Sequence, residues 1–358
     1  MMKNNLKKIR LLIDKLDKDI VKKLNERGEL AQKIKEAKNL SVNKDIFRPE
    51  REIQILRKIK DINDGPLLDS HIQSIFREIM SSCLSLEIEL KVACLGPELS
   101  YSDIALNKFF GSSVNVIFHN SISEIFDDVN RQNVDYGIVP IENSNQGSVK
   151  DTLDHLIKDD ISISGETNLV IEHCLLSKSK QINHIKKVYA HEQSFLQCND
   201  WITKNLPYAS RVYVSSNSAA AKKIQTLKNS AAIASKNCST LYKLPVLQKN
   251  IHDVIDNTTR FIIIGNKSVS SSGKDKTSML ITINNKAGSL SKLLEPLSKS
   301  GISMTKIESI PTKINNWEYM FLIDIEGHID NKKVSNALNL IRKKSVFFKH
   351  LGSYPKSI

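Results

Sequence analysis

The chain has 358 residues, a formal net charge of +13 and a hydrophobic fraction of 40%. This length predicts two or three domains, and this hydrophobic content is sufficient for folded cores. The lysines are spread along the sequence and no basic run alternates with aromatic residues, so nucleic-acid binding is not indicated, although a positive field can concentrate small anionic substrates.

Residues 1 to about 90 have the periodicity of three helices. The first is predicted from about Leu6 to Leu40, the second from near Pro49, and the third from about Asp69 to Leu90. The first helix would be roughly 50 Å long at 1.5 Å per residue. Its apolar stripe consists of Leu6, Ile9, Ile13, Leu16, Ile20 and Leu24. So small a domain cannot bury this stripe, so we predict a homodimer in which the helix packs against a second copy of itself.

The same stripe continues with charged side chains. Arg27 and Lys38 lie on it about three turns apart, and Arg10 lies beside it. The second helix directs Glu52 inward, and the third directs Glu87 inward. A buried cation without a partner costs several kcal/mol. A pocket for a small polyanion is therefore one interpretation, and a solvated helix face with coincidental spacing is the other.

This first segment resembles the all-helical chorismate mutase domain. The matching stretches are IDKLD (13–17), ERGELAQKIKEAK (26–38), RPERE (48–52) and FREIMSSCLSLE (76–87). The resemblance implies an intertwined dimer, in which Arg10 of one protomer reaches the pocket of the other. It implies that Arg10 and Arg27 hold the two carboxylates of chorismate, that Lys38 donates to the ether oxygen, and that Glu52 takes the substrate hydroxyl. The implied substrate-binding residues are Arg10, Arg27, Lys38, Arg48, Arg51, Glu52, Cys83 and Glu87.

The chemistry accounts for these residue types. Conversion of chorismate to prephenate is a pericyclic rearrangement that needs no nucleophile or metal. Negative charge grows on the ether oxygen, and each fixed donor aimed there is worth roughly 3–4 kcal/mol. Many relatives have Gln where Glu87 stands, so Glu87 is expected to be catalytic only when protonated. We expect mutase activity to fall as pH rises and Glu87→Gln to flatten the profile. Cys83, where relatives have Ser, is expected to pack rather than react.

Residues 91 to about 267 contain short β-rich runs separated by helical patterns. This alternation predicts an α/β domain of two lobes with a largely parallel sheet. An apolar strand ends directly before the polar residues 142–144, and open α/β sheets bind ligands at such strand ends. Ser and Asn caps precede helices within 96–105 and 215–223, where free backbone N–H groups favour carboxylates. Each of these features alone could be ordinary capping.

Together these stretches resemble prephenate dehydratase. The matching pieces are LGPELSYSDIA, VPIENSNQGSV, GETNLVIEHCLL, AHEQSFLQC, SSNSAA and NTTRF. The family has two α/β lobes, like a type II periplasmic binding protein, with the site in the cleft between them. The resemblance implies that Thr259 is the catalytic hydroxyl near the C4 hydroxyl that leaves prephenate. The residues implied to bind substrate with it are Ser100, Glu142, Asn143, Ser144, Gln197, Ser218 and Arg260. Leu99, Ala190 and Glu192 depart from residues usual in relatives, which puts dehydratase efficiency in doubt.

The last part of the chain begins with a predicted Ser/Gly/Lys linker at 268–277. Residues 278–358 follow with a βαββα pattern, which predicts a small ferredoxin-like α+β sandwich. The stretch 287–313 resembles an ACT domain, which pairs across a dimer and binds an end product between protomers. The expected phenylalanine contacts are Gly288, Ser289, Leu290, Glu308 and Ser309. Because Ile310 replaces the usual Arg and Ser291 removes an apolar contact, we expect weak or altered binding; the alternative is a domain kept only for assembly.

The cysteines bear on cofactors and compartment. They are odd in number and widely spaced, at Cys83, Cys94, Cys174, Cys198 and Cys238. Without a CxxC pair, neither a disulfide framework nor a zinc site is predicted, and no metal or other cofactor is expected. The apolar runs are too short to span a bilayer, and acidic residues in the first helix argue against a transit peptide. We therefore expect a cytoplasmic protein.

The three resemblances follow the order of the bifunctional chorismate mutase–prephenate dehydratase family. The predicted domains are 1–90, 91–267 and 278–358, and the implied function is conversion of chorismate to phenylpyruvate for phenylalanine synthesis. The competing class is a non-catalytic amino-acid sensor with a binding-protein cleft and a helical dimerisation arm. Retention of Arg10, Thr259 and the other motif residues favours the enzyme. The expected partners are chorismate, prephenate, L-phenylalanine and a second copy of the chain, with no nucleic acid or membrane.

Overall fold

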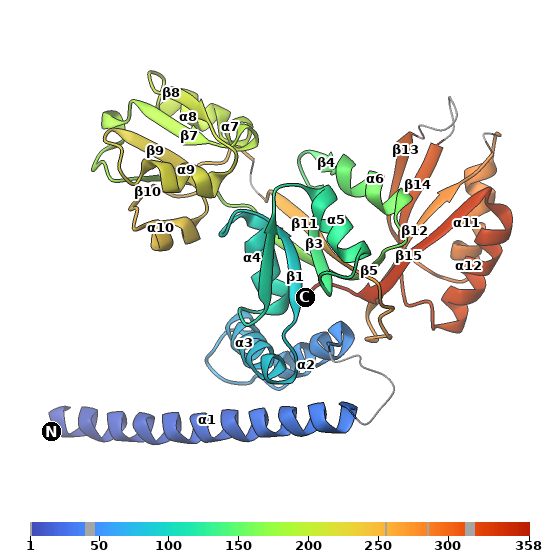
Figure 1. Ribbon diagram of the computed structural model, residues 1–358, viewed down its shortest axis with the longest axis horizontal. Helices are drawn as coiled ribbons and strands as arrows, with labels where there is room; N and C mark the ends of the chain where they lie inside the picture. The colour runs from blue at the N-terminus through green and yellow to red at the C-terminus, as the bar shows by residue number, and fades with distance from the viewer. Residues whose placement is uncertain (1, 40–46, 255, 285, 312–318) are drawn as a thin grey trace. The chain divides into compact units, whose positions relative to one another are not determined.

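The computed structural model describes residues 2–39, 47–254, 256–284, 286–311 and 319–358, and its ribbon is shown in Figure 1. The chain divides into two compact units. The first contains the residues up to Leu90 together with Phe110–Asn115, and the second contains Lys91–Phe109 and Val116–Ile358. In the part of the chain that the structure describes, no helix is long and apolar enough to cross a membrane.

The first unit is helical, as predicted. α1 spans Met2–Asn39, α2 spans Pro49–Asp61, and α3 spans Asp69–Glu87. Pro49 occupies the first turn of α2, where its missing N–H has no helical partner to lose. Buried side chains from α2 and α3 form the core between them, namely Ile53, Leu56, Met80 and Leu84.

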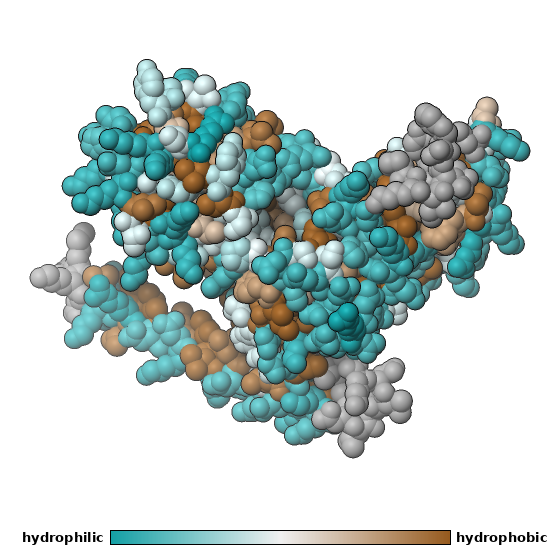
Figure 2. All heavy atoms as spheres, turned by 45° about the horizontal axis from the view of Figure 1, so that its top comes forward, coloured by the Kyte–Doolittle hydropathy of each residue, from teal (hydrophilic) through white to brown (hydrophobic). Residues whose placement is uncertain are grey.

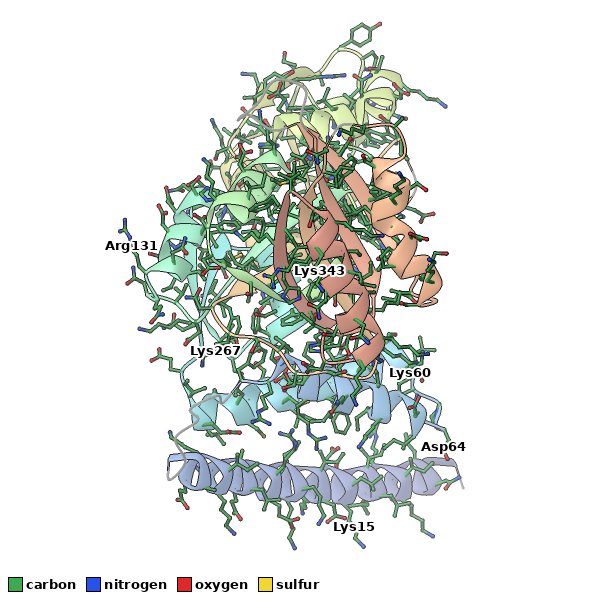
Figure 3. All side chains as sticks on the ribbon, turned by 90° about the vertical axis from the view of Figure 1, so that its right-hand side faces the viewer. Lys15, Lys60, Asp64, Arg131, Lys267 and Lys343 are labelled. Atoms are coloured by element: carbon green, nitrogen blue, oxygen red, sulfur yellow. The ribbon has the colours of Figure 1, made fainter. Side chains whose placement is uncertain are left out.

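Most of α1 is exposed within a single chain. Of its described residues only Gly28 and Ala31 are buried. Each side chain of the predicted apolar stripe is at least 37% exposed: Leu6, Ile9, Ile13, Leu16, Ile20 and Leu24. Figure 2 shows hydrophobic patches along this helix, and Figure 3 shows Lys15 extending from it on the side away from α2 and α3. One chain therefore leaves a long apolar surface uncovered, which is rare for a protein that functions as a monomer.

The second unit begins with a mixed sheet in the strand order β2-β1-β3-β11-β5. Its strands are β1 (Lys91–Leu95), β2 (Asn115–His119), β3 (Tyr136–Asn143), β5 (Ser162–Val170) and β11 (Thr258–Gly265), and the short β4 (Gly147–Ser148) pairs with β3. The helices of this lobe are α4 (Tyr101–Phe110), α5 (Ile122–Asn130) and α6 (Lys150–Lys158).

A second lobe is built on a sheet in the order β10-β6-β9-β7-β8. Its strands are β6 (Cys174–Ser177), β7 (Lys187–Ala190), β8 (Ser210–Tyr213), β9 (Ser230–Ala234) and β10 (Val246–Gln248). Its helices are the 3-10 turn η1 (Ile182–His184), α7 (Glu192–Gln197), α8 (Asn199–Asn205), α9 (Asn217–Ile224) and α10 (Lys236–Tyr242).

The prediction of a largely parallel sheet was wrong, because both sheets are mixed. β1 pairs with β3 in parallel, and β7 pairs in parallel with both β8 and β9. β11 is antiparallel to β3 and β5, and β6 is antiparallel to β9 and β10. The chain crosses between the lobes twice, through residues 171–173 and 249–257, and the strands at these crossings run against their neighbours. Ile171 N–H donates to the Asn257 carbonyl (2.7 Å), so the two crossing segments are bonded together.

The C-terminal part is a four-stranded antiparallel sheet in the order β13-β14-β12-β15 with two helices. The elements are β12 (Asp275–Thr282), α11 (Ser289–Lys299), β13 (Met304–Pro311), β14 (Tyr319–Glu326), α12 (Lys332–Lys344) and β15 (Phe347–Pro355). The βαββα pattern expected from the sequence therefore lacked its last strand. The expected linker at 268–277 contains a tight turn, in which Ser272 N–H donates to the buried Asp275 carboxylate (3.0 Å), and the start of β12.

The C-terminal sheet and the first lobe share one hydrophobic core. Its members include Ile163 and Ile262 from the first lobe and Leu322, Leu351 and Tyr354 from the C-terminal sheet. β15 also lies directly against β5. The contact requires glycine at position 352, where φ is 144° and an added Cβ would lie 2.3 Å from the carbonyl oxygen of Ile163.

Candidate functional site

A cleft of about 750 Å³ lies between the two lobes of the second unit. Its walls come from the ends of β3 and β11 and the start of α4 in the first lobe, from the crossing segment 171–173, and from α7 and α9 in the second lobe. The volume is within the range of small-molecule sites, and the position at strand ends between lobes is where such folds bind ligands.

Thr259 lines this cleft at the beginning of β11. Its hydroxyl oxygen accepts a hydrogen bond from Asn143 Nδ2 (2.8 Å), and the same nitrogen donates to Asn257 Oδ1 (2.7 Å). Asn143 Oδ1 accepts from the backbone N–H groups of Asn145 and Gln146 (3.0 and 3.2 Å), which fixes the orientation of its amide. Because Asn143 supplies the proton in its bond to Thr259, the threonine hydroxyl keeps its own hydrogen to donate to a ligand.

Three more of the expected residues line the cleft: Ser100, Gln197 and Ser218. The two serine hydroxyls are already engaged, since Ser100 donates to the Leu95 carbonyl (2.8 Å) and Ser218 donates to the Glu98 carbonyl (2.7 Å). These serines therefore shape the backbone of the cleft walls. Gln197 differs from them, because among the described residues its amide nitrogen forms no hydrogen bond.

The expectation that Glu142 and Arg260 shape the cleft is contradicted by their positions. Successive residues of a strand point to opposite faces, so Thr259 in the cleft places Arg260 on the other side of the sheet. The buried guanidinium of Arg260 donates to the carboxylates of Glu142 (3.0 Å), Glu166 (2.8 Å) and Asp324 (2.7 Å). Asp324 belongs to β14, so this network joins the first lobe to the C-terminal sheet.

Ser144 also lies outside the cleft lining. Its backbone N–H donates to the Thr258 carbonyl (2.9 Å), and its hydroxyl oxygen accepts from the Thr258 N–H (3.0 Å). These bonds close the junction between β3 and β11 just before Thr259. Ser144 thus supports the strand end on which the threonine stands.

Lys306 of β13 extends the Arg260 network toward the cleft. Its ammonium group contacts the carboxylates of Glu142 and Glu308, the latter at 3.0 Å. Hydrogen bonds from Lys306 and Arg260 outweigh burial and hold the pKa of Glu142 below its usual range. Ser148, which lines the cleft, donates to the Glu308 carboxylate. The C-terminal sheet is therefore in polar contact with a residue of the cleft wall.

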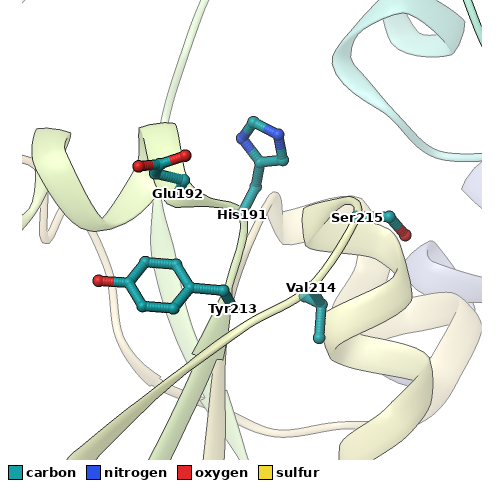
Figure 4. Close-up of a pocket in the computed structure, with 5 residues that line it drawn as sticks. All are labelled: His191, Glu192, Tyr213, Val214 and Ser215. Carbon is teal, nitrogen blue, oxygen red and sulfur yellow. The ribbon is translucent and has the colours of Figure 1, made fainter.

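Four aromatic cleft residues were missed by the sequence interpretation: Tyr101, His173, His191 and Phe261. All four stand within the quoted stretches LGPELSYSDIA, GETNLVIEHCLL, AHEQSFLQC and NTTRF, which is the signal that could have identified them. His191 also borders an adjoining hollow of about 420 Å³ with Glu192, Tyr213, Val214 and Ser215 (Figure 4). Figure 4 shows the Glu192 carboxyl group and the Tyr213 ring on the same side of this hollow.

The substitutions noted at Leu99 and Ala190 lie close to the cleft. Leu99 lines it and has a φ of 59°, a left-handed conformation that glycine adopts without strain. Its N–H donates to the Asp103 carboxylate (2.7 Å), which holds the turn in place. Ala190 is fully buried at the end of β7.

In the helical unit, Glu52 of α2 lies close to arginines from the other two helices. Burial raises the pKa of Glu52 to about 7, and the positive charges of Arg77 and Arg27 partly oppose this shift. Burial in turn lowers the pKa of Arg77. Arg77 was not among the expected residues, although it directly follows Phe76 on the inward stripe of the third helix. The structure therefore unites Glu52 and Arg27 as expected and adds Arg77.

The other residues expected in this unit are placed less closely together. Arg10, Arg48 and Arg51 are exposed in one chain, Cys83 is buried, and Glu87 is half-buried near the end of α3. The side chain of Lys38 lies outside the described residues. Cys83 borders a groove of about 700 Å³ between α1 and α3, whose other walls include Leu24, Gln32, Ile79 and Leu86.

The C-terminal domain contains a hollow of about 190 Å³ at the start of α11. Gly288, Ser289 and Leu290 line it, as does Ser291, and Gly288 precedes the helix with a φ of 78°. Glu308 does not line it, because the alternation of β13 turns its carboxylate toward Ser148, and Ser309 is exposed on the same strand. Three of the five expected phenylalanine contacts therefore lie at this hollow, and Glu308 and Ser309 lie outside it.

Family models match along almost the whole chain. Residues 9–88 match chorismate mutase type II, residues 92–269 match prephenate dehydratase, and residues 277–339 match the ACT domain. The chain is 41% identical over 360 residues to a bifunctional chorismate mutase/prephenate dehydratase of Pseudomonas aeruginosa, covering 99% of both chains.

Two solved structures resemble this fold but are described with different activities. A prephenate dehydratase from Arthrobacter aurescens in complex with L-Phe superposes with a TM-score of 0.67 at 28% identity, covering 74% of this chain and 90% of that one. GqqA, described as a quorum quenching acylase, superposes with a TM-score of 0.66 at 26% identity, covering 75% and 98%. Since the same fold carries different activities, sequence identity and site chemistry must decide between them.

Proposed function

This chain belongs to the bifunctional chorismate mutase/prephenate dehydratase family, and from that premise we propose which of its residues carry out the two reactions. It rearranges chorismate to prephenate and then converts prephenate to phenylpyruvate in phenylalanine biosynthesis. We place it in the cytoplasm, since its five cysteines are free thiols, as in a reducing compartment.

We assign the dehydratase reaction to the cleft that Thr259 lines. In this reaction the bond to the departing carboxylate breaks and releases CO₂, and its electron pair enters the ring. The C4 hydroxyl leaves with its bonding pair and takes up a proton to become water, so aromatisation drives the step. The enzyme must then orient the carboxylate and hydrogen-bond the leaving hydroxyl. The observation that supports Thr259 is its bond from Asn143, which leaves the threonine hydrogen available to that leaving group.

Thr259→Ala should reduce phenylpyruvate formation from prephenate by roughly a hundredfold or more, because the donor to the leaving hydroxyl is lost. Phenylpyruvate absorbance measures this rate, and chorismate consumption by the same sample serves as an internal control that should be unchanged. Thr259→Ser keeps the hydroxyl and should retain most of the activity. Unchanged dehydratase turnover in Thr259→Ala would refute the assignment.

We assign the mutase reaction to the site around Glu52. The charges of Arg27 and Arg77 next to this half-buried carboxyl support it, because a dianionic substrate needs fixed cations. Arg27 and Arg10 would hold the two substrate carboxylates, Lys38 and a protonated Glu87 would donate to the ether oxygen, and Glu52 would accept from the substrate hydroxyl. Arg77 would keep Glu52 in place from α3, and Arg48, Arg51 and Cys83 would border the pocket.

Mutase kcat/KM should fall as pH rises through about 7. Ionised Glu52 would draw Arg27 away from the substrate carboxylate that it holds, and an ionised Glu87 would repel the charge that grows on the ether oxygen. Rates of chorismate loss from pH 5 to 9 give the profile. Glu87→Gln should flatten it. If the decline persists in Glu87→Gln, the matched Glu52→Gln variant tests whether Glu52 is the group that titrates. A flat wild-type profile would contradict both carboxyl roles.

We propose that the exposed stripe of α1 is covered by α1 of a second copy of this chain. The stripe runs from Leu6 to Leu24, and the groove between α1 and α3 lies on the same helix. Arg10 is exposed and stands about four and a half turns before Arg27, so it cannot enter the site of its own helix. A paired helix would supply Arg10 to the partner's Glu52 site.

Arg10→Ala and Arg27→Ala should each abolish mutase activity. When the two variants are mixed after denaturation and refolding together, about a quarter of the sites should recover, since in a mixed dimer only one site receives both arginines. The control is the same procedure with Arg10→Ala alone, which should stay inactive. Failure of the mixture to recover activity would show that the site does not cross between protomers.

We propose that the hollow at Gly288, Ser289 and Leu290 binds phenylalanine weakly. The ACT match and the L-Phe complex of the Arthrobacter dehydratase support a regulatory site. Ser291 presents a hydroxyl to this hollow, where an apolar side chain would pack better against an aromatic ring. Glu308 is held by Lys306 and Ser148, so contact with a ligand would compete with these bonds.

Isothermal titration with L-phenylalanine should therefore show weak binding to the wild type and about tenfold tighter binding to Ser291→Val, since burial of apolar groups is worth roughly 0.8 kcal/mol per CH₂. Dehydratase inhibition measured on the same samples should follow the binding. Tight binding with full inhibition in the wild type would contradict the proposed weakening.

A further inference from the structure

Three cleft side chains form a hydrogen-bonded row from one lobe to the other. His173 Nδ1 lies 3.1 Å from the Tyr101 hydroxyl oxygen, and His173 Nε2 lies 2.6 Å from Gln197 Oε1. Tyr101 belongs to α4 of the first lobe, Gln197 ends α7 of the second lobe, and His173 stands on the segment that crosses between them. The histidine is 1% exposed, yet all three residues line the cleft.

The backbone around His173 connects this row to the catalytic hydroxyl. The His173 carbonyl accepts from the Ile251 N–H (2.9 Å) on the second crossing segment. Asn257, at the end of that segment, accepts from Asn143, the same amide that donates to Thr259. The residues that hold Gln197 and those that hold Thr259 therefore share one scaffold at the base of the cleft.

The imidazole is neutral in this environment. Burial lowers the pKa of His173 to about 4, although the bond to Gln197 acts in the opposite direction. A neutral imidazole donates through one nitrogen and accepts through the other. Since Gln197 Oε1 can only accept, Nε2 must carry the hydrogen, and Nδ1 is then the acceptor for the Tyr101 hydroxyl.

The Tyr101 hydroxyl has a second partner, because its oxygen also lies 2.7 Å from the Glu172 carbonyl. That carbonyl can only accept, so the one hydroxyl hydrogen is shared between it and His173 Nδ1 in the Nε2–H form. A His173 that donated from Nδ1 would need the Gln197 amide to turn and donate to Nε2. That arrangement would present the Gln197 oxygen to the cleft, where an anionic substrate would be repelled. The Nε2–H form instead directs the amide hydrogens of Gln197 into the cleft.

We propose that His173 is a positioning residue of the dehydratase: by donating from Nε2 to the Gln197 oxygen, it aims the Gln197 amide hydrogens at a carboxylate of prephenate. Tyr101 favours this tautomer, because its hydroxyl hydrogen is shared between the Glu172 carbonyl and Nδ1. The inference rests on the proposed dehydratase cleft. Its role is separate from that of Thr259, since Gln197 binds the substrate anion and does not assist the leaving hydroxyl.

The test is a double-mutant cycle with His173→Phe and Gln197→Ala, read out as KM and kcat for prephenate. His173→Phe keeps a buried ring and removes both hydrogen bonds. It should raise KM about tenfold with a smaller change in kcat, as expected for one lost hydrogen bond to a charged group. The double variant should be no worse than Gln197→Ala, because His173 acts only through that amide. Multiplied losses, or an unchanged KM in His173→Phe, would overturn the proposal.

Two milder variants cover the case in which His173→Phe does not fold, as judged by thermal unfolding. His173→Gln carries an amide N–H able to donate to Gln197 and should restore a KM close to that of the wild type. Tyr101→Phe removes the hydroxyl that favours the Nε2–H tautomer of His173. It should raise KM severalfold, with no further loss when combined with Gln197→Ala. If Tyr101→Phe has no effect and His173→Gln is as impaired as a loss of Gln197, the proposal fails. Absence of dehydratase activity in the wild type would instead refute the cleft assignment itself.

Discussion

The arrangement of the second unit depends on strand β11, because two consecutive side chains of this strand point to opposite faces of the sheet. Thr259 faces the cleft, and Arg260 faces the C-terminal sheet beneath. A buried guanidinium is tolerated only when anionic partners surround it, and here carboxylates from β3, β5 and β14 do so. The charge network therefore fixes the C-terminal sheet to the strand that carries the cleft hydroxyl of Thr259, and the shared hydrophobic core reinforces this attachment.

The cleft itself is held by neutral groups. Asn143 and Asn257 orient Thr259, while His173 and Tyr101 orient Gln197. Neutral amides, hydroxyls and an imidazole hold their geometry without adding charge that would compete with a dianionic substrate. The charged network lies on the other side of the sheet and reaches the cleft through Glu308 and Ser148. This contact is a direct physical link between the C-terminal domain and the cleft wall.

In the helical unit the candidate site is instead surrounded by charged side chains. Glu52 is half-buried next to arginines of two other helices, and loss of solvation raises its pKa. Yet a single chain leaves the apolar face of α1 uncovered and Arg10 exposed. One chain therefore leaves this helix largely uncovered, and the proposed pairing of two α1 helices would cover the apolar face and bring Arg10 to a substrate site.

The sequence by itself determined the three helices, the α/β alternation, the motif residues Thr259 and Asn143, and the inward position of Glu52, because periodicity and local motifs encode them. It did not determine which face of a strand a motif residue occupies, so Glu142 and Arg260 were placed in the cleft although they lie beneath it. Nor did it disclose Arg77, His173 or β15, whose roles depend on partners distant in sequence. Tertiary structure decided these points, since burial and hydrogen-bond partners exist only once the chain has folded.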